Sequence, residues 1–322
     1  MIEALSAADS SLGWVAMNGT VCELFCPRLT RETYDQVYRD GANPLVVGVS
    51  APAGTAEITD SGFRVSGRWP FASGCQNAKW IVGHCVVTKN GAPEMTAFGP
   101  KTLFAMLPAE SWRIDETWDA SGLTGSGSHH VVLDSVDVTE AWMCDALNGP
   151  SNIPGPLGSI FFPFIATLHA AVPVGIAAGA IADLVTQAEA GRRQLFATTD
   201  QRDTPVFQHE LGKLQASLRA ARALLQVQAD EQWERAVAGT LDGTADFAES
   251  LQGSAWIHTT CVDIVRGCFT LGGSASILNS SPLQRRLRDV LAAKQHAFAQ
   301  DRFYARAGAN ALGFEPVNPL FG

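Results

Sequence analysis

An aromatic pair and a hydroxyl stand close together in the stretch 65–75, VSGRWPFASGC. Strand-forming residues lead to Trp69 and Phe71, and Ser73 follows where the run breaks. This set suits a flat heteroaromatic ligand, because an aromatic ring can cover its face while the hydroxyl reaches a nitrogen or oxygen at its edge. The same residues are typical of an ordinary strand end with a packed tryptophan. The stretch therefore predicts a ligand site and leaves a structural role open.

The bulk composition indicates a globular protein with a sizeable core. The chain has 322 residues, of which 46% are hydrophobic, so two or more layers or domains are expected. A net charge of −9 argues against nucleic acid or an anionic membrane surface as the main partner, because both need a basic face. An anionic cofactor would therefore have to be bound by a few local arginines.

The cysteines and histidines give no sign of a metal site. Seven cysteines are scattered among apolar residues without a CxxC pair, which favours buried thiols in a reducing cytoplasm. Cys22 and Cys26 lie four residues apart, but no second ligand pair accompanies them, and the histidine spacing indicates no metal. The first residues lack a basic segment followed by an apolar core, so no signal peptide is expected.

The elements that must position these residues change in character along the chain. Residues 1–44 show helical spacing of apolar residues and form a short helical region. Residues 45–147 consist of short strands, turns and glycines, with alternation near their end, which predicts a compact antiparallel β domain. A segment rich in Pro and Gly, 148–158, marks the boundary to the third region, 148–322.

The third region has the pattern of an up-and-down helical bundle. Its long runs rich in alanine and leucine predict four helices, at 160–190, 205–238, 244–270 and 283–306. The uncharged run 159–182 within it fits a buried helix, with a membrane span as the alternative.

Six strings, in this order along the chain, resemble the acyl-CoA dehydrogenase fold. They are SAPAGTA (50–56), VSGRWPFASGC (65–75), GLTGSGSHHVVLDSVDV (122–138), GRRQ (191–194), LGGSAS (271–276) and SPLQRRLRDVLAAKQH (281–296). The chain is more narrowly similar to the flavin-dependent monooxygenases built on that fold, the oxygenase components of two-component aromatic hydroxylases. The resemblance implies an α+β protein with short N-terminal helices, a middle antiparallel β-barrel domain and a C-terminal four-helix bundle.

The resemblance also assigns candidate flavin-binding residues. It places Phe71 against the flavin ring and Ser73 at its N5 edge, with Trp69 as the other aromatic candidate. The segment Gly125, Ser126, Gly127 and Ser128 matches a glycine-serine segment near the flavin, although such a run is often only a turn.

Candidates for the phosphate end of the cofactor lie in the third region. Arg192 or Arg193 would bind a flavin phosphate, often across a subunit interface, although arginine also suits a helix C-terminus. Gly272 and Gly273 would let a nucleotide tail approach the backbone. Phe269 stands where many dehydrogenases have glutamine, so the choice between FMN and FAD stays open.

The last matching string separates two activities. In many acyl-CoA dehydrogenases the arginine and aspartate matched by Arg288 and Asp289 are followed by a catalytic glutamate, but this chain has no acid between Asp289 and Asp301. It has His296 instead, which matches the histidine of the hydroxylases and could accept the proton of a phenol as a general base. Glu210 or Glu249 from another helix keeps the dehydrogenase alternative open.

The favoured interpretation is an oxygenase that takes reduced flavin, FMNH2 or FADH2, from a separate flavin reductase. With O2 it would form a flavin hydroperoxide and hydroxylate a phenolic or polycyclic aromatic substrate, with Ser73 and His296 as catalytic residues. The alternatives are an acyl-CoA dehydrogenase and an inactive, truncated relative, since only about forty residues precede the β region where the family has a longer helical domain. The fold implies a homotetramer.

Overall fold

The protein falls into two compact units in a computed structural model that describes residues 1–97, 99–146, 149–158, 161–191, 193, 196–241 and 245–314. Unit 1 consists of residues 1–17, 120–123 and 160–322, and unit 2 consists of residues 18–119 and 124–159. The division passes through one helix after Met17, so the first 44 residues are shared between both units and do not form a third one.

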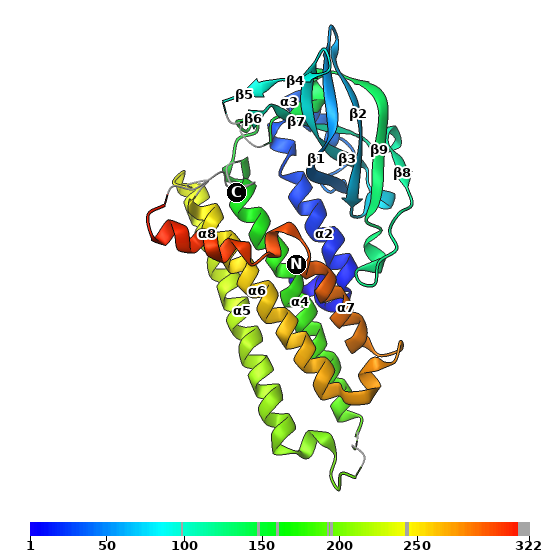
Figure 1. Cartoon of the computed structure of the whole chain (residues 1–322), viewed down its shortest axis with the longest axis vertical. Helices are drawn as coiled ribbons and strands as arrows, with labels where there is room; N and C mark the ends of the chain where they lie inside the picture. The colour runs from blue at the N-terminus through cyan, green and yellow to red at the C-terminus, as the bar shows by residue number, and fades with distance from the viewer. Residues whose placement is uncertain are drawn as a thin grey trace. The chain divides into compact units, whose positions relative to one another are not determined.

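The order of elements is helices, strands, then helices (Figure 1). The N-terminal helices are α1 (Ile2–Ala8), α2 (Ser10–Glu23) and α3 (Arg31–Val37). The strands are β1 (Val46–Thr59), β2 (Gly62–Ala72), β3 (Trp80–Lys89), β4 (Ala92–Pro93), β5 (Met95–Thr96), β6 (Gly99–Pro100), β7 (Thr102–Pro108), β8 (Arg113–Asp115), β9 (His129–Val138) and β10 (Met143–Cys144). The remaining helices are α4 (Phe161–Glu189), α5 (Pro205–Ala238), α6 (Ala245–Gly272), α7 (Pro282–Lys294) and α8 (Arg302–Ala311).

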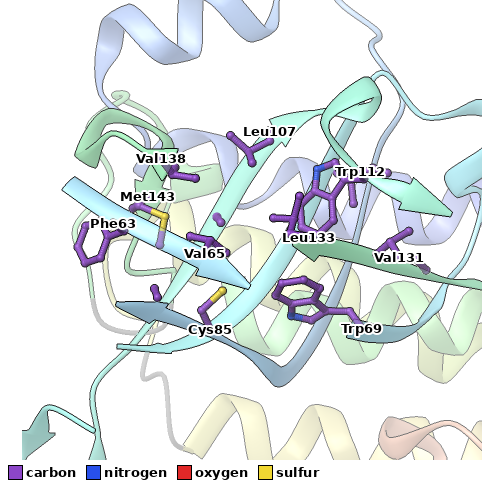
Figure 2. Close-up of a cluster of buried hydrophobic side chains, with 14 of the residues drawn as sticks. Phe63, Val65, Trp69, Cys85, Leu107, Trp112, Val131, Leu133, Val138 and Met143 are labelled. Carbon is purple, nitrogen blue, oxygen red and sulfur yellow. The ribbon is translucent and has the colours of Figure 1, made fainter. Parts of the chain in front are cut away.

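Unit 2 is built on one curled sheet with the strand order β10-β7-β3-β1-β2-β9-β8. The expectation of a purely antiparallel barrel was wrong in one respect, because β1 and β3 pair in parallel. The β1–β2 hairpin returns the chain to the start of β1, so that β3 begins beside Val46 and runs in the same direction as β1. Met143 of β10, at one end of the strand order, and Val131 of β9, next to the strand at the other end, share one buried cluster (Figure 2).

Trp69 is the largest fully buried side chain of this core. Its indole N–H donates to the carbonyl oxygen of His84 at 2.7 Å. A Cβ atom at Gly54, Gly67 or Gly83 would lie 2.0, 2.8 and 2.8 Å, respectively, from the nearest indole atom. The three glycines therefore leave the space that the indole fills.

Unit 1 is organised around α4, which packs against α1, α5, α6 and α7. By length and composition the segment Phe164–Glu189 could cross a membrane, but 78% of its most apolar window is buried within the protein, as in the core helix of a bundle. The predicted helices at 160–190, 205–238 and 244–270 are confirmed by α4, α5 and α6.

The fourth predicted helix, 283–306, was wrong because the chain turns between α7 and α8. A short 3-10 helix, Ala297–Ala299, occupies this turn, and His296 is its N-cap residue. The sequence contains neither proline nor glycine here, so helix propensity favours continuation. Tertiary hydrogen bonds from α6 and α7, described below, override that propensity.

Candidate functional site

In unit 2, an irregularity in β2 turns Phe71 out of the sheet core. The register between β2 and β9 shifts between Trp69 and Ala72, which is a β-bulge. Phe71 has a φ of +64°, a left-handed conformation that is unfavourable for a bulky residue. The residue is 64% exposed, whereas Trp69 and Ala72 are buried. Strain of this kind persists where the surrounding structure imposes it, and it is frequent at functional sites.

A chain of buried hydroxyls lies directly beside this bulge. The Oγ atom of Ser128 lies 2.7 Å from Oγ of Ser73 and 2.7 Å from Oγ of Ser126. The backbone N–H of Gly74 also donates to the carbonyl oxygen of Ser126 at 2.8 Å. The structure thus brings together residues of the two predicted segments, 65–75 and 125–128, with Gly125 in the short 3-10 helix Thr124–Ser126.

Sequence reasoning missed the residues that flank the Phe71 ring. The rings of Trp118 and His130 meet it edge to face, with centroids 6.3 and 6.2 Å away. His129 fixes the loop before β9, because its Nδ1 atom accepts the backbone N–H groups of Thr117 and Trp118, each at 3.0 Å. No spacing rule connects these residues to Phe71. The pairing of β2 with β9 brings His130 to it, and the hydrogen bonds of His129 hold the loop that carries Trp118.

The prediction of Trp69 as an alternative aromatic cover for a ligand is wrong. Its side chain is fully buried in the sheet core and presents no exposed face. The bulge separates the two aromatic residues, so Phe71 alone remains exposed.

The phosphate-end candidates lie in unit 1 and receive weaker support. Arg192 lies outside the described residues. Arg193 is exposed beyond the end of α4, and its Nε atom lies 2.9 Å from Oδ1 of Asp200. Gly272 is buried, and a Cβ atom there would lie 2.2 Å from Oγ of Ser276, so close packing within its own turn already requires glycine. Gly273 follows with a φ of +61°.

Unit 1 also contains a cluster of aromatic rings around His296. The His169 ring of α4 stacks on the His296 ring with centroids 4.0 Å apart and an interplanar angle of 20°. The Trp14 ring of α2 meets the His296 ring edge to face at 5.6 Å, and the Phe298 ring lies 5.4 Å away. His296 itself is half-buried.

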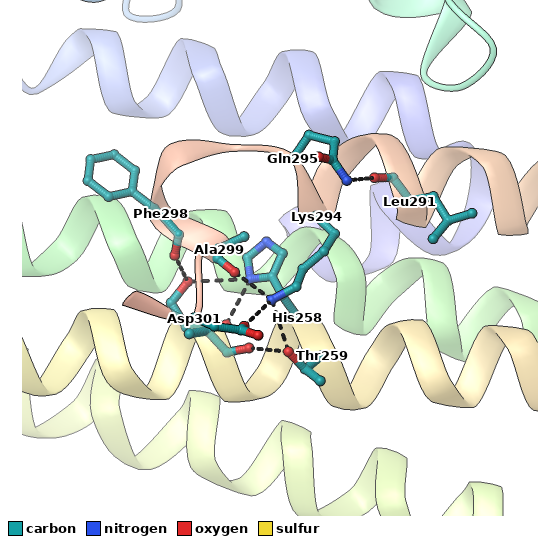
Figure 3. A network of polar contacts seen from close by, with 10 residues as sticks. His258, Thr259, Leu291, Lys294, Gln295, Phe298, Ala299 and Asp301 are labelled. Carbon is teal, nitrogen blue, oxygen red and sulfur yellow. Dashed lines mark hydrogen bonds and ion pairs between the residues drawn. The ribbon is translucent and has the colours of Figure 1, made fainter. Parts of the chain in front are cut away.

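Hydrogen bonds define the turn that carries His296. Nζ of Lys294 donates to Oγ1 of Thr259 at 2.9 Å, to the carbonyl oxygen of Ala299 at 2.6 Å and to Oδ1 of Asp301 at 2.9 Å (Figure 3). Oγ of Ser254 on α6 donates to the carbonyl oxygen of Phe298 at 3.0 Å. Together these bonds tie residues 294–301 to α6 and hold the turn in place of a longer helix.

The three histidines of this cluster are kept neutral. Burial lowers the pKa of His296 to about 4, and burial lowers the pKa of His258 on α6 to about 3. Burial, with the nearby His296 and His258 rings, holds the pKa of His169 well below its usual range. Charged imidazole is therefore disfavoured here at neutral pH.

His169, His258 and Trp14 are further residues that sequence reasoning missed. They lie on α4, α6 and α2, and their sequence spacing gives no signal. Only the packing of the helices brings them together, so the packing partners of each helix would have been needed to find them.

The Arg288–Asp289 pair of α7 anchors the short segment 120–123 within unit 1. Oδ1 of the buried Asp289 accepts the backbone N–H of Leu123 at 2.7 Å, and Nη1 of Arg288 donates to the carbonyl oxygen of Ser121 at 2.8 Å. Leu123 has a φ of +52°, and a Cβ atom at Gly122 would lie 2.2 Å from the carbonyl oxygen of Arg288. The pair thus has a structural role that explains its buried carboxylate.

The chain is similar to known proteins over most of its length. Residues 167–301 match the family model of the acyl-CoA dehydrogenase C-terminal domain. The chain is 33% identical to the indole-3-acetate monooxygenase of Pseudomonas putida, over 98% of this chain and 79% of that relative. It is 30% identical to the oxygenase component of the FADH2-dependent resorcinol hydroxylase of Rhizobium sp., over 97% of this chain and 79% of that relative.

Solved structures share the fold over nearly the whole chain. XiaF from Streptomyces sp., in complex with FADH2 and glycerol, has a TM-score of 0.90 and 25% identity, covering 99% of this chain and 82% of that one. The 3-HSA hydroxylase from Rhodococcus sp. RHA1 has a TM-score of 0.88 and 24% identity, covering 99% and 83%, and shows the fold alone. The resemblance inferred from the six strings is confirmed, and the chain belongs to the flavin-dependent monooxygenases built on the acyl-CoA dehydrogenase fold.

Proposed function

We propose that this chain is an oxygenase component that uses reduced flavin and O2 to hydroxylate an electron-rich aromatic substrate. The observation that carries the proposal is the exposed, strained Phe71 ring beside the buried hydroxyl chain of Ser73, Ser128 and Ser126. An apolar ring face next to a hydroxyl is the donor set that a planar ligand with polar edge atoms requires.

The residues of unit 2 fit a flavin ring on these grounds. Reduced flavin, when bound, supplies the electrons that activate O2. Phe71 would lie against the ring and Ser73 would hydrogen-bond to its edge, while Ser128 and Ser126 orient the Ser73 hydroxyl. Trp118 and His130 hold the Phe71 ring from the side. Arg193, Gly272 and Gly273 remain candidates for the phosphate end, which leaves FMN and FAD to be compared by experiment.

The acyl-CoA dehydrogenase alternative is less well supported. The stretch between Asp289 and Asp301 has no carboxylate. Of the acids on other helices, Glu210 is ion-paired with Lys213 at 3.1 Å on the exposed side of α5, and Glu249 is exposed on α6. Neither side chain is buried.

The substrate class follows from the chemistry of oxygen transfer and from the relatives. An electron-rich ring is the partner that an electrophilic oxygen needs, and the similar proteins are named for indole-3-acetate and resorcinol. We therefore place indoles and phenols first among the substrates. A separate flavin reductase would supply the cofactor, and the free, buried cysteines suit a cytoplasmic protein. A homotetramer is proposed from the fold, to be tested by light scattering of the purified chain.

The test is a single-turnover reaction with anaerobically reduced flavin. Purified protein is mixed with FMNH2 or FADH2 and then with buffer containing 18O2 and indole-3-acetate, resorcinol or phenol. We expect one 18O atom in the product, and a yield at least tenfold lower for Ser73→Ala, the size expected when one positioned donor is removed. The exposed Ser61→Ala variant, in the β1–β2 turn, should match the wild-type protein.

Three results would contradict the proposal. If flavin binds but no reaction with any of the aromatic substrates gives 18O-labelled product, the protein is an inactive relative. Bleaching of bound oxidised flavin by an acyl-CoA thioester would indicate a dehydrogenase. Equal product yields from Ser73→Ala and Ser61→Ala would show that the hydroxyl chain does not take part in the reaction.

A further inference from the structure

His169 is a buried imidazole for which the proposed chemistry has no direct use. It is 2% exposed, its ring contacts Trp14 at 5.7 Å and Phe298 at 5.3 Å, and within the described part of the chain its Nδ1 atom has no hydrogen-bond partner. Burying a polar nitrogen without a partner is unfavourable, and an apolar side chain would fill the same space at a lower free energy. Its ring stacks at 4.0 Å on His296, so the contact with that residue is its distinguishing feature.

The hydrogen bonding of His296 fixes which nitrogen carries the hydrogen. The backbone N–H of Phe298 donates to Nδ1 of His296 at 3.3 Å, so Nδ1 must be an acceptor. A neutral imidazole has one hydrogen, which then lies on Nε2. A general base at Nε2 would instead need its lone pair there and the hydrogen on Nδ1, and this tautomer would lose the bond from Phe298.

The ring cluster restricts the orientation of His296 as well. His169 covers one face of the imidazole, and Trp14 approaches edge to face at an angle of 72°. Rotation of the ring about its χ2 torsion would exchange Nδ1 with carbon and break the Phe298 contact. A flat ring at stacking distance opposes that rotation, and the hydrogen bonds of Lys294 and Ser254 hold the backbone of the turn.

We propose that His169 is a positioning residue that holds His296, by stacking on its ring, in the orientation with the hydrogen on Nε2. His296 then acts as a neutral hydrogen-bond donor to a polar atom of the substrate and not as the proton acceptor expected from the sequence. This inference rests on the proposed function for the substrate, but the state of the His296 ring is independent of it. A donor would bind the oxygen of a phenol or phenolate and stabilise negative charge on it.

The decisive measurement is the tautomer of His296 by long-range 1H–15N correlation in flavin-free protein labelled at histidine nitrogen. A His296→Gln sample assigns the signals. We expect the Nε2–H pattern in the wild-type protein and in His169→Phe, which keeps a stacking ring. His169→Ala should give averaged shifts from both tautomers, and His209→Ala, an exposed histidine on α5, should leave the pattern unchanged. Where His169→Ala does not fold, His169→Asn takes its place.

A wild-type spectrum with the hydrogen on Nδ1 would overturn the proposal, and so would an unchanged Nε2–H pattern without a ring at position 169. Because this readout needs neither flavin nor substrate, a protein without hydroxylase activity would leave it interpretable. With an active substrate, product yield per flavin oxidised should fall about tenfold to a hundredfold in His169→Ala and recover in His169→Phe.

Discussion

The two groups of candidate residues are built in different ways. In unit 2, Phe71, Ser73, Ser126 and Ser128 come from two short segments that neighbouring strands bring together, and a hydroxyl chain joins them. In unit 1, His296 lies among rings from α2 and α4, with polar nitrogens that are buried and partly unsatisfied. One group is joined by hydroxyl contacts and has a strained backbone at Phe71, whereas the other is held by the packing of aromatic and imidazole rings. Each should therefore respond to different perturbations.

The largest contrast is expected between two aromatic neighbours in unit 2. Trp69→Ala removes a fully buried indole and should lower the free energy of unfolding by about 3–5 kcal/mol. Phe71→Ala removes an exposed ring and should change stability by less than about 0.5 kcal/mol, while weakening flavin binding at least tenfold. Urea denaturation and flavin titration by fluorescence measure the two effects.

Phe196 provides a matched control, because it is also a phenylalanine with positive φ, at +67°, and is 95% exposed. Phe196→Ala should leave flavin binding unchanged. Equal losses of flavin affinity in Phe71→Ala and Phe196→Ala would show that exposure and strain alone do not identify a ligand contact.

Acid should act on the histidine cluster, because hydroxyl groups do not titrate in this range. The pKa of His258 is about 3 in the folded protein against 6.5 in the unfolded chain, so between these values the unfolded chain binds the proton that the folded protein excludes. The free energy of unfolding therefore carries no penalty from His258 above pH 6.5, and it decreases as the pH falls from 6.5 towards 3. At pH 5 the loss from His258 alone should be about 2 kcal/mol.

Urea denaturation at pH 7.5 and pH 5 tests this expectation. His258→Gln should reduce the difference between the two pH values, whereas His209→Gln, at an exposed site, should not. An unchanged difference in His258→Gln would mean that other groups carry the acid sensitivity.

A smaller loss of stability than for Trp69→Ala is expected from the middle of the hydroxyl chain. Ser128→Ala removes the hydroxyl that contacts both Ser73 and Ser126, and it should lower the free energy of unfolding by about 1–2 kcal/mol. If the hydroxyl chain acts as a unit, Ser73→Ala and the double variant that combines it with Ser128→Ala should give equal product yields. Independent, additive losses would show that Ser128 does not orient Ser73.

The sequence predicted the strand-rich region and the three long helices, because local patterns determine these features. Alternating apolar residues located β9, whereas Ser126 and Ser128 became candidates only through the resemblance to a family segment. The bulge at Phe71 could not be predicted, because one extra residue in a strand leaves no mark in the hydrophobic pattern. Trp69 and Phe71 were therefore predicted to act together, although one is buried in the sheet core and the other is exposed.

The histidine cluster was largely invisible from the sequence for a related reason. His169, His258 and Trp14 are distant in the chain and meet His296 only through helix packing. The break after Lys294 depends on hydrogen bonds to Thr259 and Asp301, which no local propensity encodes. Similarity to a family identified His296 as a candidate. It did not predict that His296 lies in a turn or that its Nδ1 atom accepts a hydrogen bond.

The division of the chain has a consequence for the order of events on the ribosome. Unit 2 is fully synthesised once residue 159 has been added, whereas α1 belongs to unit 1 and packs against α4, which is translated later. A Cβ atom at Gly175 of α4 would lie 2.3 Å from the carbonyl oxygen of Glu3, so α1 has its partner only after Gly175 has been translated. During synthesis α1 therefore stays without its partner α4 while the strands of unit 2 are completed.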